Sequence, residues 1–175
     1  AERIELFVKS YEYDELLFTN ITILESNKIK KIRKWKKNVK ATDLLFNNYI
    51  GNQVFTELKI LKEFGGFDLE MQIWQDFEAW FNILKNGKYN ARLISNYSYV
   101  LDVQHELGRI TTSKKLKLNI AYQYFCNKHE LNSFERKILY TNLYNYDPKL
   151  LNRKMIFLKL IYGFNFYDLK KFIFG

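Results

Sequence analysis

Cysteine is almost missing from this chain of 175 residues. The single Cys126 excludes a disulfide within the chain, and a lone thiol fits a reducing compartment. No cysteine and histidine cluster has the spacing of a zinc site. No apolar run approaches the roughly 20 residues that a membrane-spanning helix needs. These absences exclude a disulfide scaffold and a Cys/His zinc module, and they predict no membrane-spanning helix in this sequence.

The composition is instead apolar and basic. Hydrophobic residues make up 47% of the chain and aromatic residues 18%, which indicates a globular protein. This length suits one domain, or one domain with an appendage, and folding buries roughly 68–70% of such a chain's surface. Lysine and arginine number 28 against 19 acidic residues, for a net charge of +9. The charge attracts polyanions such as nucleic acid, anionic lipid headgroups or diphosphate substrates, but a basic surface kept for solubility explains it equally well.

The most informative stretch is Gly65-Gly66-Phe67-Asp68 and the segment that follows it. Two adjacent glycines allow a tight turn or a close approach to a ligand. The next segment, 74–86, is predicted to be a helix, because its apolar residues recur at helical spacing; they are Trp74, Phe77, Trp80, Phe81 and Leu84. Asp76 falls in the first turn on one flank of this stripe and Glu78 on the other, so they form no facing pair. The helix N-terminus is expected to favour the ionised form of Asp76.

The rest of the first part alternates between strand and helix patterns, so the fold class is predicted to be α/β. Strands are expected at 16–24, 29–35, 50–55, 89–93 and 97–103, the first two forming a hairpin. Helices are expected at 2–10, at 42–46 after a Thr42 or Asp43 cap, and at 57–64 with Gly65 after its end. The basic run at 30–37 is expected to be a solvated edge of the sheet, with a phosphate or membrane contact as the weaker alternative.

From Lys114 the pattern is helical only. Asn132 and Glu135 resemble a capping box for a helix that runs to about Tyr144. The tail, 153–175, mixes basic residues with large apolar ones. Two interpretations stay open for this tail: packing on the domain or on a second copy of the chain as a homodimer, which we favour slightly, or lying as an interfacial helix on a membrane surface.

Three pieces of the sequence together resemble the family 2 glycosyltransferases, which have the GT-A fold. These pieces are Asn48-Tyr49-Ile50-Gly51, Gly65 to Asp68, and Gln75-Asp76-Phe77-Glu78-Ala79-Trp80, and the match in order and spacing covers about residues 14–113. The resemblance implies that Asp76 is the catalytic base. It also implies a set of residues at the substrates: Gly51, Asn52, Gly65, Gly66, Trp74, Gln75, Arg109 and Ser113. His105 would be a metal or phosphate contact, although a lone histidine after a strand is more often structural.

The implied reaction is transfer of a sugar, with inversion, from a nucleotide-sugar donor to a hydroxyl of a lipid-linked or glycan acceptor. The implied cofactor is Mg²⁺ or Mn²⁺. The usual setting is bacterial polysaccharide synthesis at the cytoplasmic face of the cell membrane. Trp74 and Trp80 would give flat apolar walls beside Asp76 for a sugar to stack on.

The family's first half, with its Asp-x-Asp metal motif, does not precede this region, and the chain opens at Ala1 without methionine. We therefore expect residues 1–110 to be a partial GT-A domain that lacks its N-terminal half, in a piece of a longer protein. Residues 111–175 would be a helical appendage. The piece is expected to bind nucleotide sugars poorly by itself.

Two other functions fit the composition. A basic nucleic-acid binder would use the net charge and the aromatic residues, but the sequence has no recognisable binding motif, so nucleic acid is not the expected partner. A non-catalytic interaction or dimerisation module would keep the helices of a transferase without its chemistry.

Overall fold

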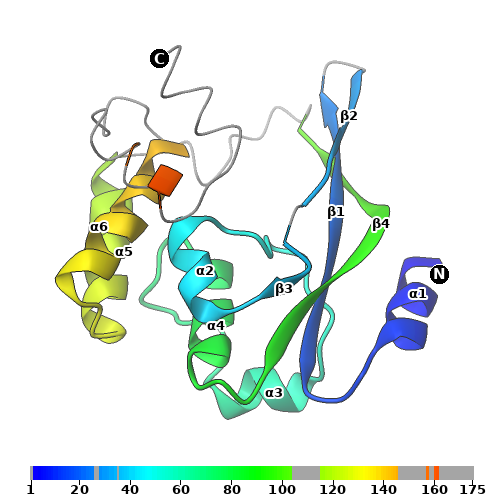
Figure 1. Ribbon diagram of the computed structural model, residues 1–175, viewed down its shortest axis with the longest axis horizontal. Helices are drawn as coiled ribbons and strands as arrows, with labels where there is room; N and C mark the ends of the chain where they lie inside the picture. The colour runs from blue at the N-terminus through cyan, green and yellow to red at the C-terminus, as the bar shows by residue number, and fades with distance from the viewer. Residues whose placement is uncertain are drawn as a thin grey trace.

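A mixed four-stranded sheet forms the backbone of the fold in the computed structural model, which describes residues 2–25, 28–34, 36–103 and 115–145 and positions 157, 160 and 161. The strands are β1 Glu15–Glu25, β2 Lys28–Ile32, β3 Asn38–Val39 and β4 Asn90–Asp102, in the order β2-β1-β4-β3 (Figure 1). β1 pairs antiparallel with β2, as the predicted hairpin requires, and parallel with β4. β3 runs antiparallel to β4. The protein is therefore of the mixed α/β class.

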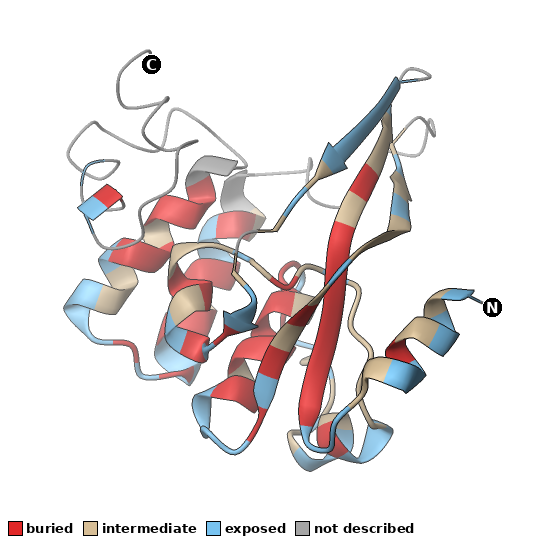
Figure 2. Ribbon diagram, turned by 45° about the vertical axis from the view of Figure 1, so that its right-hand side comes forward, coloured by how far each residue is buried: buried red, intermediate tan, exposed pale blue. Residues whose placement is uncertain are grey.

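Burial explains why β1 lies inside the sheet and β2 at its edge. Leu16, Leu17 and Phe18 on β1 are fully buried, because this part of the strand is covered on both faces (Figure 2). Continuous apolar runs of this kind are typical of strands enclosed by helices. Residues 28–31 of β2 are all exposed, so its lysines face solvent on the outermost strand. Lysine on an edge strand discourages pairing with other chains, in agreement with the solvated edge predicted for the start of the basic run.

Two predicted strand boundaries are wrong. Residues 50–55 form a loop with a single bridge, between Leu17 and Phe55, and Gly51 has a φ of +78°, which no extended strand accommodates. The strands predicted at 89–93 and 97–103 are one strand, β4. The register with β1 shifts at the predicted break: between the pairs Thr19/Ile94 and Ile21/Tyr99, residues 95–98 of β4 lie opposite Asn20 alone.

Helices cover the sheet on both sides. α1 Glu2–Ser10 lies on one side, while α2 Ala41–Phe46 and α4 Gln75–Lys85 lie on the other, and α3 Leu58–Glu63 sits at the lower end of the sheet in this view (Figure 1). α5 Lys115–Lys128, α6 Ser133–Tyr140 and a short 3-10 helix, Thr141–Asn145, form a further layer beyond α2 and α4. No helix in the described ranges is long and apolar enough to cross a membrane.

The predicted helix caps are confirmed in one case and wrong in another. Asn132 accepts hydrogen bonds from the backbone of Phe134 and Glu135, and the Glu135 carboxylate accepts from Asn132 N–H at 2.9 Å, so the capping box is present. α2 is capped differently from the prediction: it begins at Ala41, and Lys40 is the residue before it. Asp43 then lies one turn inside, where its carboxylate accepts the Lys40 N–H at 2.8 Å.

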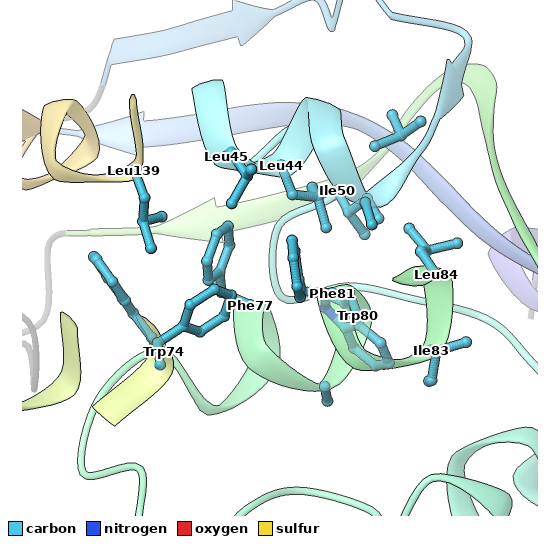
Figure 3. Packing of buried hydrophobic residues seen from close by; sticks show 14 of the residues in the cluster. Leu44, Leu45, Ile50, Trp74, Phe77, Trp80, Phe81, Ile83, Leu84 and Leu139 are labelled. Atoms are coloured by element: carbon cyan, nitrogen blue, oxygen red, sulfur yellow. The ribbon is translucent and has the colours of Figure 1, made fainter. Parts of the chain in front are cut away.

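One apolar core joins these layers. Its buried cluster includes Phe18 of β1, Leu44 of α2 and Phe81 of α4, together with Phe125 of α5 and Leu139 of α6. Figure 3 shows Phe77 and Phe81 of α4 on the side of the helix that faces Leu44 and Leu45 of α2. The core therefore continues across the boundary predicted near residue 110. In the tail, Leu160 is buried while Phe157 and Ile161 are exposed, and the rest of 153–175 lies outside the described residues.

Candidate functional site

The two adjacent glycines end helix α3. Gly65 N–H donates to the Lys62 carbonyl at 3.1 Å and Gly66 N–H to the Leu61 carbonyl at 2.9 Å, which is the Schellman pattern. Their φ angles are +83° and +75°, a region that side chains with a Cβ strongly disfavour. No heavy atom of the described chain lies within 4 Å of the place where a Cβ would stand. Of the two roles open to these glycines, the tight turn is thus present, and contact with a substrate stays a prediction.

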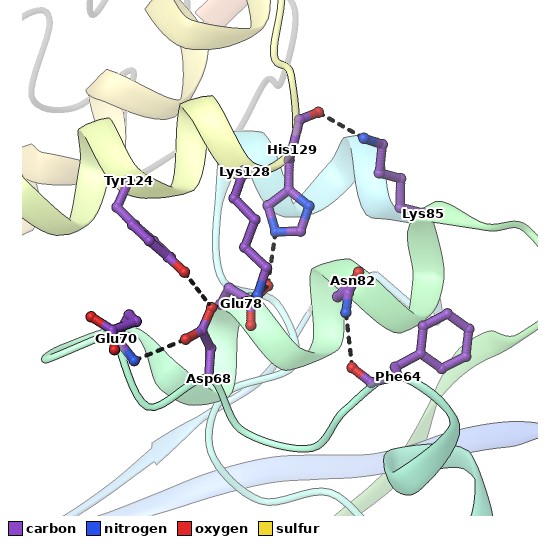
Figure 4. Close-up of polar contacts among 9 residues, drawn as sticks. All are labelled: Phe64, Asp68, Glu70, Glu78, Asn82, Lys85, Tyr124, Lys128 and His129. Atoms are coloured by element: carbon purple, nitrogen blue, oxygen red, sulfur yellow. Dashed lines mark hydrogen bonds and ion pairs between the residues drawn. The ribbon is translucent and has the colours of Figure 1, made fainter.

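The turn is fastened to α5 through Asp68 (Figure 4). The Asp68 carboxylate accepts hydrogen bonds from the Tyr124 hydroxyl at 3.0 Å, the Lys128 ammonium at 2.5 Å and the Glu70 N–H at 2.9 Å. Burial alone would raise the pKa of Asp68, but these donors outweigh it and the pKa is lowered. Asp68 is therefore an ionised anchor that holds the loop after Gly66 against the helical layer.

The sequence analysis gave Glu78 no structural role, but the structure buries it in a cluster of polar contacts. Only 1% of its side chain is exposed, and one carboxylate oxygen lies 2.8 Å from Lys128 Nζ and 2.9 Å from His129 Nε2. Burial raises the pKa of Glu78, but hydrogen bonds from His129 and Lys128 reverse the shift and lower it. The signal was present in the sequence: Glu78 lies four residues after Trp74 and three before Phe81, on the buried side of the stripe. Its carboxylate therefore contacts Lys128 and His129 in the folded protein.

Asp76 lies in the first turn of α4, one turn before Trp80. The Trp80 indole N–H donates to the Gly51 carbonyl at 2.9 Å, and Gly51 N–H donates to the Asn48 side chain at 2.8 Å. These two bonds hold the 48–51 loop against the helix whose first turn carries Asp76. Two of the three motif pieces that resemble a glycosyltransferase therefore meet directly in the fold.

The third piece joins them through Phe67. Its ring, which is 47% exposed, meets Trp80 edge-on, with ring centroids 5.8 Å apart. The prediction that Trp74 and Trp80 form apolar walls for a sugar is wrong, because the two residues are only 8% and 4% exposed. Trp74 packs on Phe77 and Phe125 in the core. The aromatic surface that solvent reaches next to α4 therefore belongs to Phe67.

Burial decides the electrostatics of Asp76. The backbone N–H groups of Asp76 and Phe77 favour its ionised form, as expected at a helix start, but partial burial outweighs them and raises the pKa of the carboxyl above its ordinary value. The net direction is opposite to the expectation. No basic side chain in the described ranges lies within ion-pair distance of Asp76. A carboxylate with a raised pKa and no cationic partner is a stronger base than an ordinary aspartate.

The remaining predicted site residues fall into two groups, exposed residues and residues outside the described part of the chain. Gln75 and Asn52 are exposed at the start of α4 and in the 48–55 loop. His105, Arg109 and Ser113 lie outside the described residues. Within the part of the chain that the structure describes, no three or more His, Cys, Asp or Glu side chains gather where they could hold a metal ion. The expected Mg²⁺ or Mn²⁺ thus has no ligand set there.

Comparisons of the chain with protein-family models, with curated proteins and with solved structures found no match.

Proposed function

We propose that the chain is part of an inverting glycosyltransferase with a GT-A fold, in which Asp76 deprotonates the acceptor hydroxyl. The observation that carries the proposal is the hydrogen bond from Trp80 to the Gly51 carbonyl. It brings the Asn48–Gly51 loop against the helix that bears Asp76, with Phe67 on the same indole. Two of the three motif pieces that resemble one family thus contact Trp80, which belongs to the third.

The carboxylates divide the work in the way that such a reaction needs. An inverting transferase uses one base, which takes a proton while the sugar is attacked from the opposite face. Glu78 and Asp68 share an ion pair with Lys128, and Glu78 also lies within hydrogen-bond distance of His129, so both carboxylates are held by partners and neither is free to take a proton. Asp76 has no such partner in the described ranges and has a raised pKa. It is the carboxylate on α4 best suited to accept a proton.

The exposed ring of Phe67 supplies an apolar surface against Trp80, one helical turn after Asp76. The Asp68 anchor to Lys128 and Tyr124 fixes the loop that carries Phe67, so the ring is held rather than free. An apolar ring face suits the C–H face of a sugar. The metal that the family resemblance implies would neutralise the departing diphosphate. The described residues offer no ligand set for this metal.

The test is Asp76→Asn in the full-length protein, assayed by release of nucleoside diphosphate from UDP-, GDP- and TDP-sugars with Mn²⁺. The expected loss in turnover is roughly 10²–10⁴, the usual contribution of a positioned base. The acidic limb of the wild-type pH–rate profile should lie above the ordinary aspartate value of 3.8, since burial raises this pKa, and the limb should be missing in the variant.

Glu70→Gln is the matched control, because Glu70 is an exposed carboxylate in the neighbouring loop. It should keep both turnover and melting temperature. Asp76→Asn should keep the melting temperature or raise it slightly, since a half-buried carboxylate without a counter-ion is removed. Wild-type turnover in Asp76→Asn would end the assignment of this residue as the base.

A further inference from the structure

Two basic side chains, Arg3 and Lys34, contact the loop at residues 50–53 and have no carboxylate partner in the described part of the chain. Lys34 follows β2, and its backbone N–H is held by the buried Asn20 side chain of β1 at 2.8 Å. Its ammonium group lies 4.9 Å from the centre of the fully buried Phe18 ring and donates to the Ile50 carbonyl. This ammonium is also 3.4 Å from where a Cβ on Gly51 would stand. Lys34 is therefore folded back against the core and not extended into solvent.

Arg3 of α1 approaches the same loop from another direction. Its guanidinium lies 5.2 Å from the Phe7 ring centre and 5.0 Å from the Tyr99 ring centre, and Nη1 donates to the Gln53 side chain at 2.9 Å. The Nε of Arg3 is buried and has no hydrogen-bond partner. Burial, and after it the charge of Arg3, lower the pKa of Lys34 to about 8. The two cations are thus close enough to repel each other.

Nothing in the described part of the chain neutralises this pair. No carboxylate there lies within ion-pair distance of Arg3 or Lys34, whereas Lys36, Lys88, Arg92 and Lys128 each have such a partner. An ammonium group has three N–H donors, and the Ile50 carbonyl uses one. Partly buried charges without a counter-ion are unfavourable, and folded proteins rarely keep them without a use. The N–H donors and the positive charge of Arg3 and Lys34 are complementary to an anion.

We propose that Arg3, Lys34 and Gln53 form a binding site for an oxyanion, the phosphate or carboxylate group of a small ligand. Guanidinium and ammonium donors are the usual partners of such oxygens, and charge-assisted hydrogen bonds to them are strong. The Lys34 ammonium lies beside Gly51, 3.4 Å from where a Cβ at this position would stand. The site is independent of the proposed transferase activity: Asp76→Asn should leave anion binding unchanged, so either proposal can fail alone.

The first experiment uses the wild-type chain with ¹³C-labelled lysine. Inorganic pyrophosphate and, separately, glucuronate are titrated in while NaCl keeps the ionic strength constant. We expect a saturable shift of the Lys34 Cε signal and a rise of its pKa from about 8, because a bound anion stabilises the ammonium form. Response to pyrophosphate alone identifies a phosphate site, response to glucuronate alone a carboxylate site, and response to both a general oxyanion site. No saturable response to either probe overturns the proposal.

Variants provide the second measurement. Lys34→Met and Arg3→Met should each weaken binding of the active probe about tenfold or more, the usual effect of losing one charged donor. Lys30→Met is the matched control, because Lys30 belongs to the same basic segment but is exposed on β2. The Lys30→Met variant should bind the active probe with the wild-type binding constant. If Lys34→Met does not fold, Arg3→Met and the wild-type titration still decide. Equal weakening by all three variants would mean general charge screening and would overturn the site.

Discussion

Replacing Glu78 with glutamine tests the best-defined polar contact in the fold. Breaking a buried ion pair from one side costs about 3–5 kcal/mol when the remaining charge has no other partner. Here the cost is smaller for two structural reasons. Lys128 keeps Asp68 at 2.5 Å and is 31% exposed, so its charge is not stranded. A glutamine oxygen can also still accept the hydrogen bond from His129. We therefore expect Glu78→Gln to lower the free energy of unfolding by about 1–3 kcal/mol.

The pH dependence of this loss has a definite sign. The folded pKa of Glu78 lies below its ordinary value of 4.5. The carboxylate therefore contributes its full stabilisation above that ordinary value, and the contribution is lost as the pH falls through the folded pKa. The difference between wild type and Glu78→Gln should be largest near pH 7 and should shrink below about pH 4.5.

Urea unfolding at pH 7 and pH 4, followed by tryptophan fluorescence, measures the free energy difference and its pH dependence, and a thermal melt at pH 7 gives the melting temperature. At pH 7 the melting temperature should fall by roughly 2–12 °C, as expected for a chain of this size. Glu70→Gln, an exposed carboxylate nearby, should change the free energy of unfolding by less than about 0.5 kcal/mol. If Glu78→Gln were as stable as this control at pH 7, the buried contacts to Lys128 and His129 would not stabilise the fold, and the reasoning would be refuted.

Two further predictions concern the α3 turn and the tail. Gly66→Ala should lower the free energy of unfolding by about 1–2 kcal/mol, because its φ of +75° disfavours any side chain even though nothing crowds it; an unchanged urea midpoint would contradict the strained-turn argument, and Lys62→Ala on the same helix serves as the control. Deleting residues 153–175 should lower the melting temperature, because Leu160 is buried. If the deletion instead left stability intact and released the protein from anionic vesicles, the interfacial interpretation of the tail would be correct.

Local signals allowed much of the fold to be predicted from the sequence. Helical spacing of apolar residues gave α4, the glycine at 65 gave the end of α3, and Asn132 with Glu135 gave the start of α6. The β1–β2 hairpin followed from two β-rich runs with a turn between them. Each of these features depends on one short segment, the longest being the hairpin that pairs Ile21 with Ile32, so they can be predicted without distant contacts. The position of Asp76 in the first turn of a helix was likewise predicted from its local neighbours.

Tertiary structure decided the electrostatics and the partners. His129 lies 51 positions from Glu78, and the Asn142 side chain donates to the Leu45 carbonyl of α2 from 97 positions away. Burial reversed the expected pKa direction of Asp76, and it turned Trp74 and Trp80 from proposed sugar platforms into core residues. Desolvation and cross-chain pairing depend on which surfaces meet in three dimensions. Spacing along the chain therefore determined where the carboxylates stand, and only packing decided which of them are neutralised.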